Sequence, residues 1–139
     1  MPLRLVAGRV GVFKPSTGLR VMRLRPLGST GLSVSELTLG AWSLGTGMYG
    51  KVDADEARRI ILKAIDLGIN AFDTADIYGR GISERILGDV LRGYDDVHVF
   101  TKVGYNMYSN EPRQRFDREY LLKAIGIPSI LSLIHISEP

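Results

Sequence analysis

The sequence of 139 residues contains no cysteine, which excludes disulfide bonds and metal sites built on thiolates. It also lacks an apolar run of the roughly 20 residues that a membrane-spanning helix needs. Histidine is scarce, with only His98 and His135, and we expect no metal centre. The remaining composition, 45% hydrophobic and 24% charged, is that of an ordinary globular domain with a buried core.

Negative charge is missing from the first part of the chain. No acidic residue precedes Glu36, and residues 1–21 carry four basic residues. Residues 126–139 hold one acidic residue and no basic one. Removing both ends from the totals of 18 basic and 15 acidic residues leaves 14 of each. The basic character therefore belongs to the N-terminal extension, and we expect a cytoplasmic protein with no nucleic-acid or membrane partner.

Extended segments are predicted at the start of the patterned region. The stretch "LRPLGSTGLSVSELTLG", residues 24–40, indicates a hairpin around a Gly28–Gly31 turn. Leu37 and Leu39 are expected to begin the first buried strand.

A helix with clear end signals is predicted over residues 53–68. Asp53 is the expected N-cap, and Glu56 three residues later completes a capping box. Gly68 is a natural residue to follow the last turn. The helical spacing predicts one buried apolar stripe, made of Ala57, Ile60, Ile61, Ala64 and Ile65.

Two further strand–helix pairs follow. Residues 69–75 and 97–103 are short apolar segments typical of strands. One helix is predicted from a Ser83 cap to Gly93, and another begins after an Asp117 cap. The core-facing residues of the first of these helices are expected to be Ile86, Leu87, Val90 and Leu91.

The element order is strand then helix, three times. This order predicts an α/β fold with parallel strands joined by helical crossovers. An open doubly wound sheet and part of an eightfold barrel both fit it.

The glycine-rich stretch "GTGMYG", residues 45–50, matches the dinucleotide-binding pattern G-x-G-x-x-G. In that fingerprint the glycines open the helix, so that its amides meet the phosphates. Here the capping box places the helix start at Asp53, after the last glycine, and its carboxylate would repel phosphate. A plain strand-to-helix loop is therefore favoured, with a Rossmann-type dehydrogenase as the alternative.

Three chemically complementary side chains are predicted to meet at one rim of the sheet. Asp73 ends the second strand, Tyr78 lies five residues later, and Lys102 ends the third strand. An ammonium group favours the ionised form of a nearby tyrosine, and a carboxylate keeps the ammonium charged and in place. Such a trio can protonate a carbonyl oxygen while hydride reaches the carbon. Each residue alone is more often structural, but their joint placement at successive strand ends favours a site.

The segments "FDTADIYGRGISERILG" and "FTKVG", with the hairpin region, resemble the signature of the aldo-keto reductases over about residues 22–125. This resemblance implies a (β/α)₈ TIM barrel, of which the chain would supply the N-terminal hairpin and the first three strand–helix units. It also implies reduction of a small aldehyde or ketone with NADP(H), less often NAD(H).

The resemblance assigns roles to individual residues. Tyr78 corresponds to the proton donor, Lys102 to its partner, and Asp73 to the residue that holds the lysine and also lines the cofactor site. The segment after the first strand that lines the nicotinamide site corresponds to Gly40, Ala41 and Trp42. His98 would lie two layers below the rim and is expected to be structural.

Both ends are expected to be foreign to this barrel. Residues 1–21 precede a plausible start at Met22. The tail "LSLIHISEP" imitates the family's histidine-bearing fourth strand, but too few residues separate His135 from the third helix. A codon series that encodes residues 131–139 matches a transposon-end adapter used in sequencing libraries. Residues 126–139 are therefore predicted to be an artefactual tail, with the origin of residues 126–130 left open between adapter and native sequence. The chain itself is expected to be inactive, with a non-catalytic, channel-regulating relative of the family as a further alternative.

Overall fold

A computed structural model describes residues 22–46, 52–106 and 113–125. The predicted extension and the predicted artefactual tail with His135 lie outside the described residues, and so do Gly47 and Gly50 of the glycine pattern.

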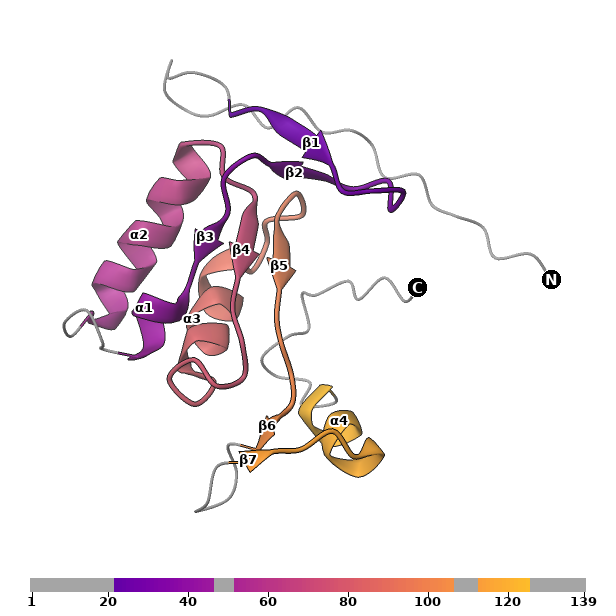
Figure 1. The fold of residues 1–139 in the computed structure, drawn as a ribbon. Helices are drawn as coiled ribbons and strands as arrows, with labels where there is room; N and C mark the ends of the chain where they lie inside the picture. The colour runs from indigo at the N-terminus through magenta and orange to yellow at the C-terminus, as the bar shows by residue number, and fades with distance from the viewer. Residues whose placement is uncertain (1–21, 47–51, 107–112, 126–139) are drawn as a thin grey trace.

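Three short parallel strands form the centre of the fold: β3 (Leu39–Gly40), β4 (Ala71–Asp73) and β5 (His98–Phe100). They are hydrogen-bonded in the order β3-β4-β5, so β4 is the middle strand (Figure 1). Phe72 of β4 is fully buried in the core. The predicted α/β arrangement with parallel strands is thus confirmed.

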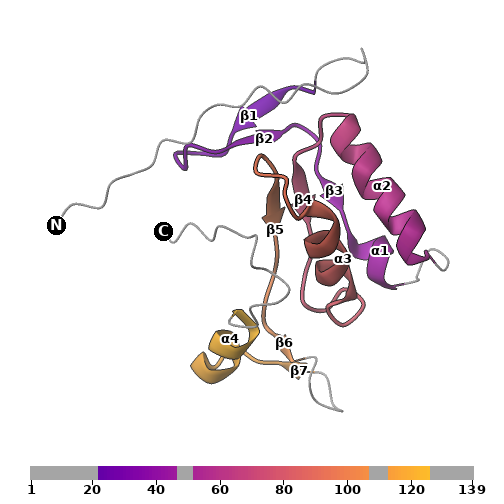
Figure 2. The ribbon, with the colours of Figure 1, turned by 180° about the vertical axis from the view of Figure 1, so that it is seen from behind.

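An antiparallel hairpin of β1 (Leu24–Pro26) and β2 (Ser33–Ser35) lies across the N-terminal end of this sheet (Figures 1 and 2). Its turn contains the predicted glycines, with φ of 55° at Gly28 and 79° at Gly31, a region that side chains disfavour. The predicted hairpin is confirmed. The first buried strand, however, does not include Leu37, whose exposed fraction is 59%. The Ser35 hydroxyl donates to the Leu37 carbonyl and holds a bend there.

The long helix α2 (Ala54–Asp66) packs along one side of the sheet and is capped as predicted. The Asp53 carboxylate accepts a 2.7 Å hydrogen bond from the Glu56 amide. At the other end, Gly68 has a φ of 86° and its amide donates to the Ile65 carbonyl, which ends the helix. Four residues of the predicted stripe are buried: Ala57, Ile61, Ala64 and Ile65.

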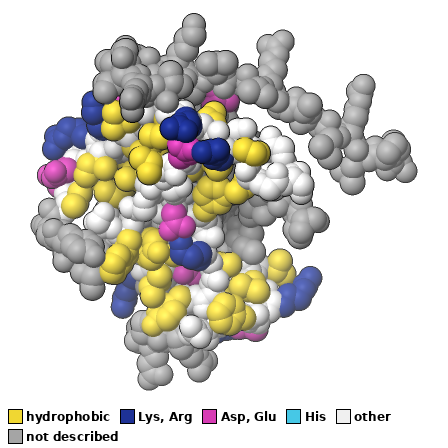
Figure 3. All heavy atoms as spheres, turned by 45° about the horizontal axis from the view of Figure 1, so that its top comes forward, with side chains coloured by type: hydrophobic (Ala, Val, Ile, Leu, Met, Phe, Trp, Pro, Cys, Tyr) yellow, Lys and Arg dark blue, Asp and Glu magenta, His cyan; other side chains and the backbone are white. Residues whose placement is uncertain are grey.

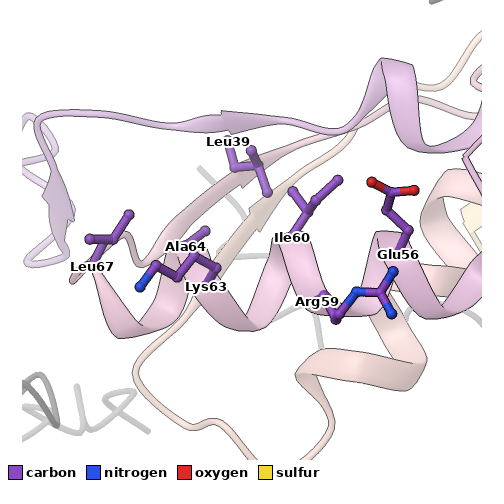
Figure 4. A pocket seen from close by; sticks show the side chains of 7 residues that line it. All are labelled: Leu39, Glu56, Arg59, Ile60, Lys63, Ala64 and Leu67. Carbon is purple, nitrogen blue, oxygen red and sulfur yellow. The ribbon is translucent and has the colours of Figure 1, made fainter. Parts of the chain in front are cut away.

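The fifth stripe residue, Ile60, is 36% exposed, and its predicted burial is wrong. It lies on the flank of α2 beside a shallow pocket of about 380 Å³. Figure 4 shows that Leu39 of β3 lines one side of this pocket and α2 side chains line the other. None of the predicted site residues lines it. The pocket lies beside β3, an edge strand of the described sheet, where a closed barrel would place a further strand and helix.

The second crossover helix, α3 (Ile82–Leu91), packs against α1 (Trp42–Thr46) and α2. Its predicted Ser83 cap is wrong. The residue before the helix is Gly81, which is left-handed with a φ of 78° and supplies no side-chain cap. Ser83 instead lies inside the first helical turn and is fully buried. The predicted core residues Leu87, Val90 and Leu91 are buried, and Ile86 packs against them.

Beyond β5, a small ladder of β6 (Tyr105–Asn106) and β7 (Arg113–Gln114) leads into α4 (Arg118–Ile125). These elements lie beyond the C-terminal end of the sheet, opposite the hairpin (Figure 1). Asp117 caps α4 as predicted, because its carboxylate accepts a hydrogen bond from the Tyr120 amide. The Arg115 guanidinium beside it lowers the pKa of Asp117 to about 2.

Within the described ranges, no helix combines the length and apolar character that a membrane crossing needs, and no cluster of potential metal ligands is found. On the face seen in Figure 3, basic side chains are interspersed with acidic ones rather than gathered into one patch.

Candidate active site

A charged pair lies at the C-terminal end of the parallel sheet. The Lys102 ammonium is 2.7 Å and 2.9 Å from the two carboxylate oxygens of Asp73. Asp73 is the last residue of β4, and Lys102 follows β5 by two residues. Backbone hydrogen bonds continue the pairing past the strands, from the Asp76 amide to the Lys102 carbonyl. The sheet itself therefore holds the two predicted residues side by side.

Tyr78 lies against this pair. The Lys102 ammonium is 5.2 Å from the centroid of the tyrosine ring, close enough for a cation–π attraction. On another side, the ring centroid of Trp42 lies 6.3 Å away at an interplanar angle of 42°. The structure thus brings together Asp73, Tyr78 and Lys102, and it adds Trp42 as an aromatic neighbour.

The electrostatics of the site favour a charged lysine. Partial burial lowers the pKa of Lys102, but the hydrogen bond and negative charge of Asp73, with a smaller contribution from Tyr78, outweigh that effect. The net result is a pKa above the usual value for lysine. The Lys102 side chain is 53% exposed and that of Asp73 42%, so the pair remains open to solvent and to a ligand.

The loop that carries Tyr78 has an unusual backbone. Gly79, Arg80 and Gly81 all have positive φ, at 61°, 55° and 78°. A side chain at Gly79 would overlap the backbone of Gly45 in α1, so only glycine fits this close approach. Gly45, the first glycine of the G-x-G-x-x-G pattern, thus serves here to pack α1 against the tyrosine loop. Helix α2 begins only after Asp53, so these glycines do not open it as the glycines of a dinucleotide-binding fingerprint would.

A buried polar network lies beneath the site. The Ser83 hydroxyl donates to the Ala41 carbonyl at 2.8 Å and accepts from the Thr74 hydroxyl at 2.9 Å. The Ser83 amide donates to the Tyr78 carbonyl at 3.2 Å. Sequence reasoning missed this role and assigned Ser83 to capping. The signal available was the position of a small hydroxyl residue on the core-facing side of a helix next to the site.

A second group that the sequence reasoning missed is the carboxyl of Glu84, which is buried next to the site. It accepts a 2.6 Å hydrogen bond from the Thr101 hydroxyl. Burial raises the pKa of Glu84, the Thr101 hydrogen bond opposes the increase, and the charge of Asp76 adds to it. Asp76 itself accepts hydrogen bonds from the amides of Gly104 and Tyr105, so it fixes the segment after β5.

The residues expected to hold a nicotinamide cofactor, Gly40, Ala41 and Trp42, lie at the end of β3 and are called the cofactor shelf. Gly40 pairs with Asp73 in the sheet register, and a side-chain carbon at Gly40 would meet nothing within 4 Å. Ala41 is buried and its amide donates to the Asp73 carbonyl, while Trp42 is 39% exposed. An open glycine surface, an aromatic face and a carboxylate fit a planar ring with a carboxamide and a nearby sugar hydroxyl. His98 is the first residue of β5 and pairs in register with Ala71, so it lies at the N-terminal end of the strand, whereas the site lies at the C-terminal end.

Comparison with known proteins agrees with this arrangement. The model of the aldo/keto reductase family matches residues 36–126, which is more than half of the sequence. The chain belongs to the aldo/keto reductase family. A solved aldo-keto reductase of Bacillus halodurans, in its holo form, superimposes with a TM-score of 0.67 at 36% identity. That match covers 81% of this chain and 36% of the other. It selects the predicted TIM barrel over the open doubly wound sheet.

Two curated relatives illustrate the range of this family. An uncharacterized oxidoreductase of Bacillus subtilis, YqkF, is 44% identical over 60% of this chain and 26% of its own length. The L-glyceraldehyde 3-phosphate reductase of Escherichia coli is 38% identical over 75% of this chain and 31% of its own length. The chain thus spans about a third or less of these two relatives. In this aldo/keto reductase segment, the described part corresponds to the hairpin and three strand–helix units of the barrel.

Proposed function

We propose that this chain forms part of the active site of a reductase that converts a small aldehyde or ketone to an alcohol with NADP(H), less often NAD(H). The observation that supports it is the Asp73–Lys102 ion pair beside Tyr78. All three lie at the C-terminal ends of parallel strands, where barrel enzymes carry their catalytic groups.

The chemistry assigned to the side chains follows from their contacts. Tyr78 donates its hydroxyl proton to the carbonyl oxygen of the substrate. Lys102, held by Asp73, stabilises the negative charge that then remains on the tyrosine oxygen. When bound, a reduced nicotinamide supplies the hydride that the carbonyl carbon receives. Gly40, Trp42 and the Asp73 carboxylate would hold it.

The chain alone is proposed to give no turnover. The described part contains three parallel strands, and a barrel requires eight. The test of function therefore uses a chimera, in which residues 36–126 replace the matching segment of the Escherichia coli reductase.

Replacing Tyr78 by Phe in this chimera tests the proton donor. We expect kcat for carbonyl-dependent NADPH oxidation to fall by a factor of about 100 or more, since general acid catalysis contributes that much. The affinity for NADPH, measured by fluorescence titration, should change little. Tyr94→Phe is the matched control, because Tyr94 lies between α3 and β5, at the N-terminal rather than the C-terminal end of the strand. A Tyr78→Phe chimera as fast as the parent would refute the assignment.

A second candidate function rests on another relative. A protein described as a "probable voltage-gated potassium channel subunit beta" of Oryza sativa subsp. japonica is 36% identical over 59% of this chain and 25% of its own length. A non-catalytic subunit of this kind would bind NADPH without brisk turnover. A parent chimera that binds NADPH tightly but oxidises it no faster with carbonyl compounds than without them would favour this candidate.

A further inference from the structure

We propose that Ser83 is a positioning residue, whose buried hydroxyl holds Trp42 against Tyr78 at the cofactor shelf. The assignment of a cofactor to that shelf rests on the proposed function, but the positioning itself does not. The hydroxyl of Ser83 joins the end of β3 to the end of β4 through Ala41 and Thr74.

Helix α1 depends on such an anchor. It has only five residues, Trp42–Thr46, and helices this short are unstable without tertiary contacts. Its first turn is closed by a 3.2 Å bond from the Leu44 amide to the Ala41 carbonyl. The same carbonyl accepts the shorter bond from the Ser83 hydroxyl, at 2.8 Å. The buried hydroxyl of Ser83 therefore fixes the direction in which the chain continues from β3 into Trp42.

Ser83 also reaches the other side of the aromatic pair. Its amide donates to the Tyr78 carbonyl, so one residue contacts both the segment before Trp42 and the tyrosine itself. Ser83 and Thr74 are fully buried, and no water can replace a lost partner without entering the core. Removing the hydroxyl would take away the shorter bond to the Ala41 carbonyl and would free α1 to shift relative to Tyr78.

The sequence provides a direct probe, because Trp42 is its only tryptophan. Acrylamide quenching of the fluorescence of the 139-residue chain measures how firmly Trp42 is held. We expect Ser83→Ala to raise the quenching constant about twofold, as local order around the indole is lost. Thr74→Val should leave it near the wild-type value, because that change keeps the bond between Ser83 and Ala41.

Ser35→Ala is the matched control. Ser35 is a buried serine with two hydrogen bonds of its own, but it lies at the hairpin end of the sheet. It should lower stability to urea without changing the quenching of Trp42. Equal quenching in the Ser83→Ala and Ser35→Ala chains would overturn the proposal. If far-UV circular dichroism shows that Ser83→Ala does not fold, Ser83→Cys decides, because a thiol is a weak donor of similar shape. Its quenching constant should lie above the wild-type value, and a wild-type value would overturn the proposal.

Kinetics of the chimera separate this proposal from the proposed function. Ser83→Ala should raise the KM for NADPH about fivefold, the effect of one lost buried hydrogen bond, and lower kcat much less. If the parent chimera does not bind NADPH, the proposed function fails, while the quenching result still decides the role of Ser83. If NADPH binds, the Ser83→Ala chimera keeps the parent KM and the 139-residue Ser83→Ala chain keeps the wild-type quenching constant, the positioning role is refuted and the proposed function stands.

Discussion

The two ends of the parallel sheet are closed by buried polar groups of different kinds. At the hairpin end, the Asn70 side chain accepts from the Ser35 amide at 2.7 Å and donates to the Ser33 carbonyl at 3.0 Å. At the site end, Ser83 and Thr74 form a neutral network, but charged groups lie above it. The buried network at the hairpin end uses neutral partners alone, and its Arg25–Glu36 ion pair lies at the surface. The site end adds the open Asp73–Lys102 pair and the buried carboxyl of Glu84.

The two ends therefore differ in how much they contribute to the stability of the sheet. The buried network of the hairpin end pairs amides, hydroxyls and backbone groups, so this network stabilises the sheet without depending on the charge of a side chain. The site end carries Asp73 and Lys102 with half-exposed side chains, and such exposed pairs add little stability. What the site end has is the Asp73–Lys102 pair beside Tyr78, in a loop held by close backbone packing, chiefly at Gly79.

Gly79→Ala should destabilise the site end of the sheet and should cause the largest loss of stability among these variants. The new side chain would both strain a left-handed residue and overlap the Gly45 backbone, so we expect a loss of about 3 kcal/mol or more. Urea unfolding followed by circular dichroism measures it. Gly28→Ala is the control, because Gly28 is also left-handed but has open space around it. That variant should lose only about 1 kcal/mol. Equal losses would show that packing against α1 is unimportant.

Asn70→Ala should instead weaken the attachment of the hairpin to the N-terminal end of the sheet. It removes one buried and one partly buried hydrogen bond and leaves the Ser35 amide without its acceptor, so we expect a loss of about 2 kcal/mol. Amide hydrogen exchange should accelerate first in β1 and β2, and the fluorescence of Trp42 should not change. A change in Trp42 with an intact hairpin would contradict the separation of the two ends.

The sequence predicted those parts of this arrangement that local patterns encode. Turn glycines predicted the hairpin, and Asp53 and Gly68 predicted the ends of α2. The grouping of the three site residues was predicted from their positions after successive strands. Residues at the C-terminal ends of neighbouring parallel strands lie close together whatever the rest of the chain does. The ion pair of Asp73 and Lys102 therefore forms as expected.

The residues that were predicted wrongly depend on distant partners. Serine is a common N-cap, but the hydroxyl of Ser83 binds Thr74 nine residues away and Ala41 forty-two residues away. Periodicity placed Ile60 on the buried stripe, yet no described element covers that flank of α2. In both cases the outcome is set by what packs against the helix, which the spacing along one helix does not contain.

Glu84→Gln should cause the smallest change in stability. This change should depend on pH, whereas the effect of a substitution at the hairpin end should not. In an unfolded chain glutamate has a pKa of about 4.3. Burial raises the pKa of Glu84 in the folded state, so between the two values the folded chain keeps a proton that the unfolded chain has released. The stability of the wild type therefore falls as pH rises through this window. Glu84→Gln should remove that fall and be relatively more stable at neutral pH.

Thr101→Val supplies the opposite change at the same site. It removes the hydrogen bond that lowers the pKa of Glu84, so the pKa should rise further and the loss of stability with pH should grow. Urea unfolding measured from pH 3 to pH 8 would show three curves that spread apart as pH rises, with Glu84→Gln the flattest. Parallel curves would mean that the carboxyl is not desolvated in the folded chain. Asn70→Ala should shift the curve without changing its shape, because the hairpin end buries no ionisable group in its network.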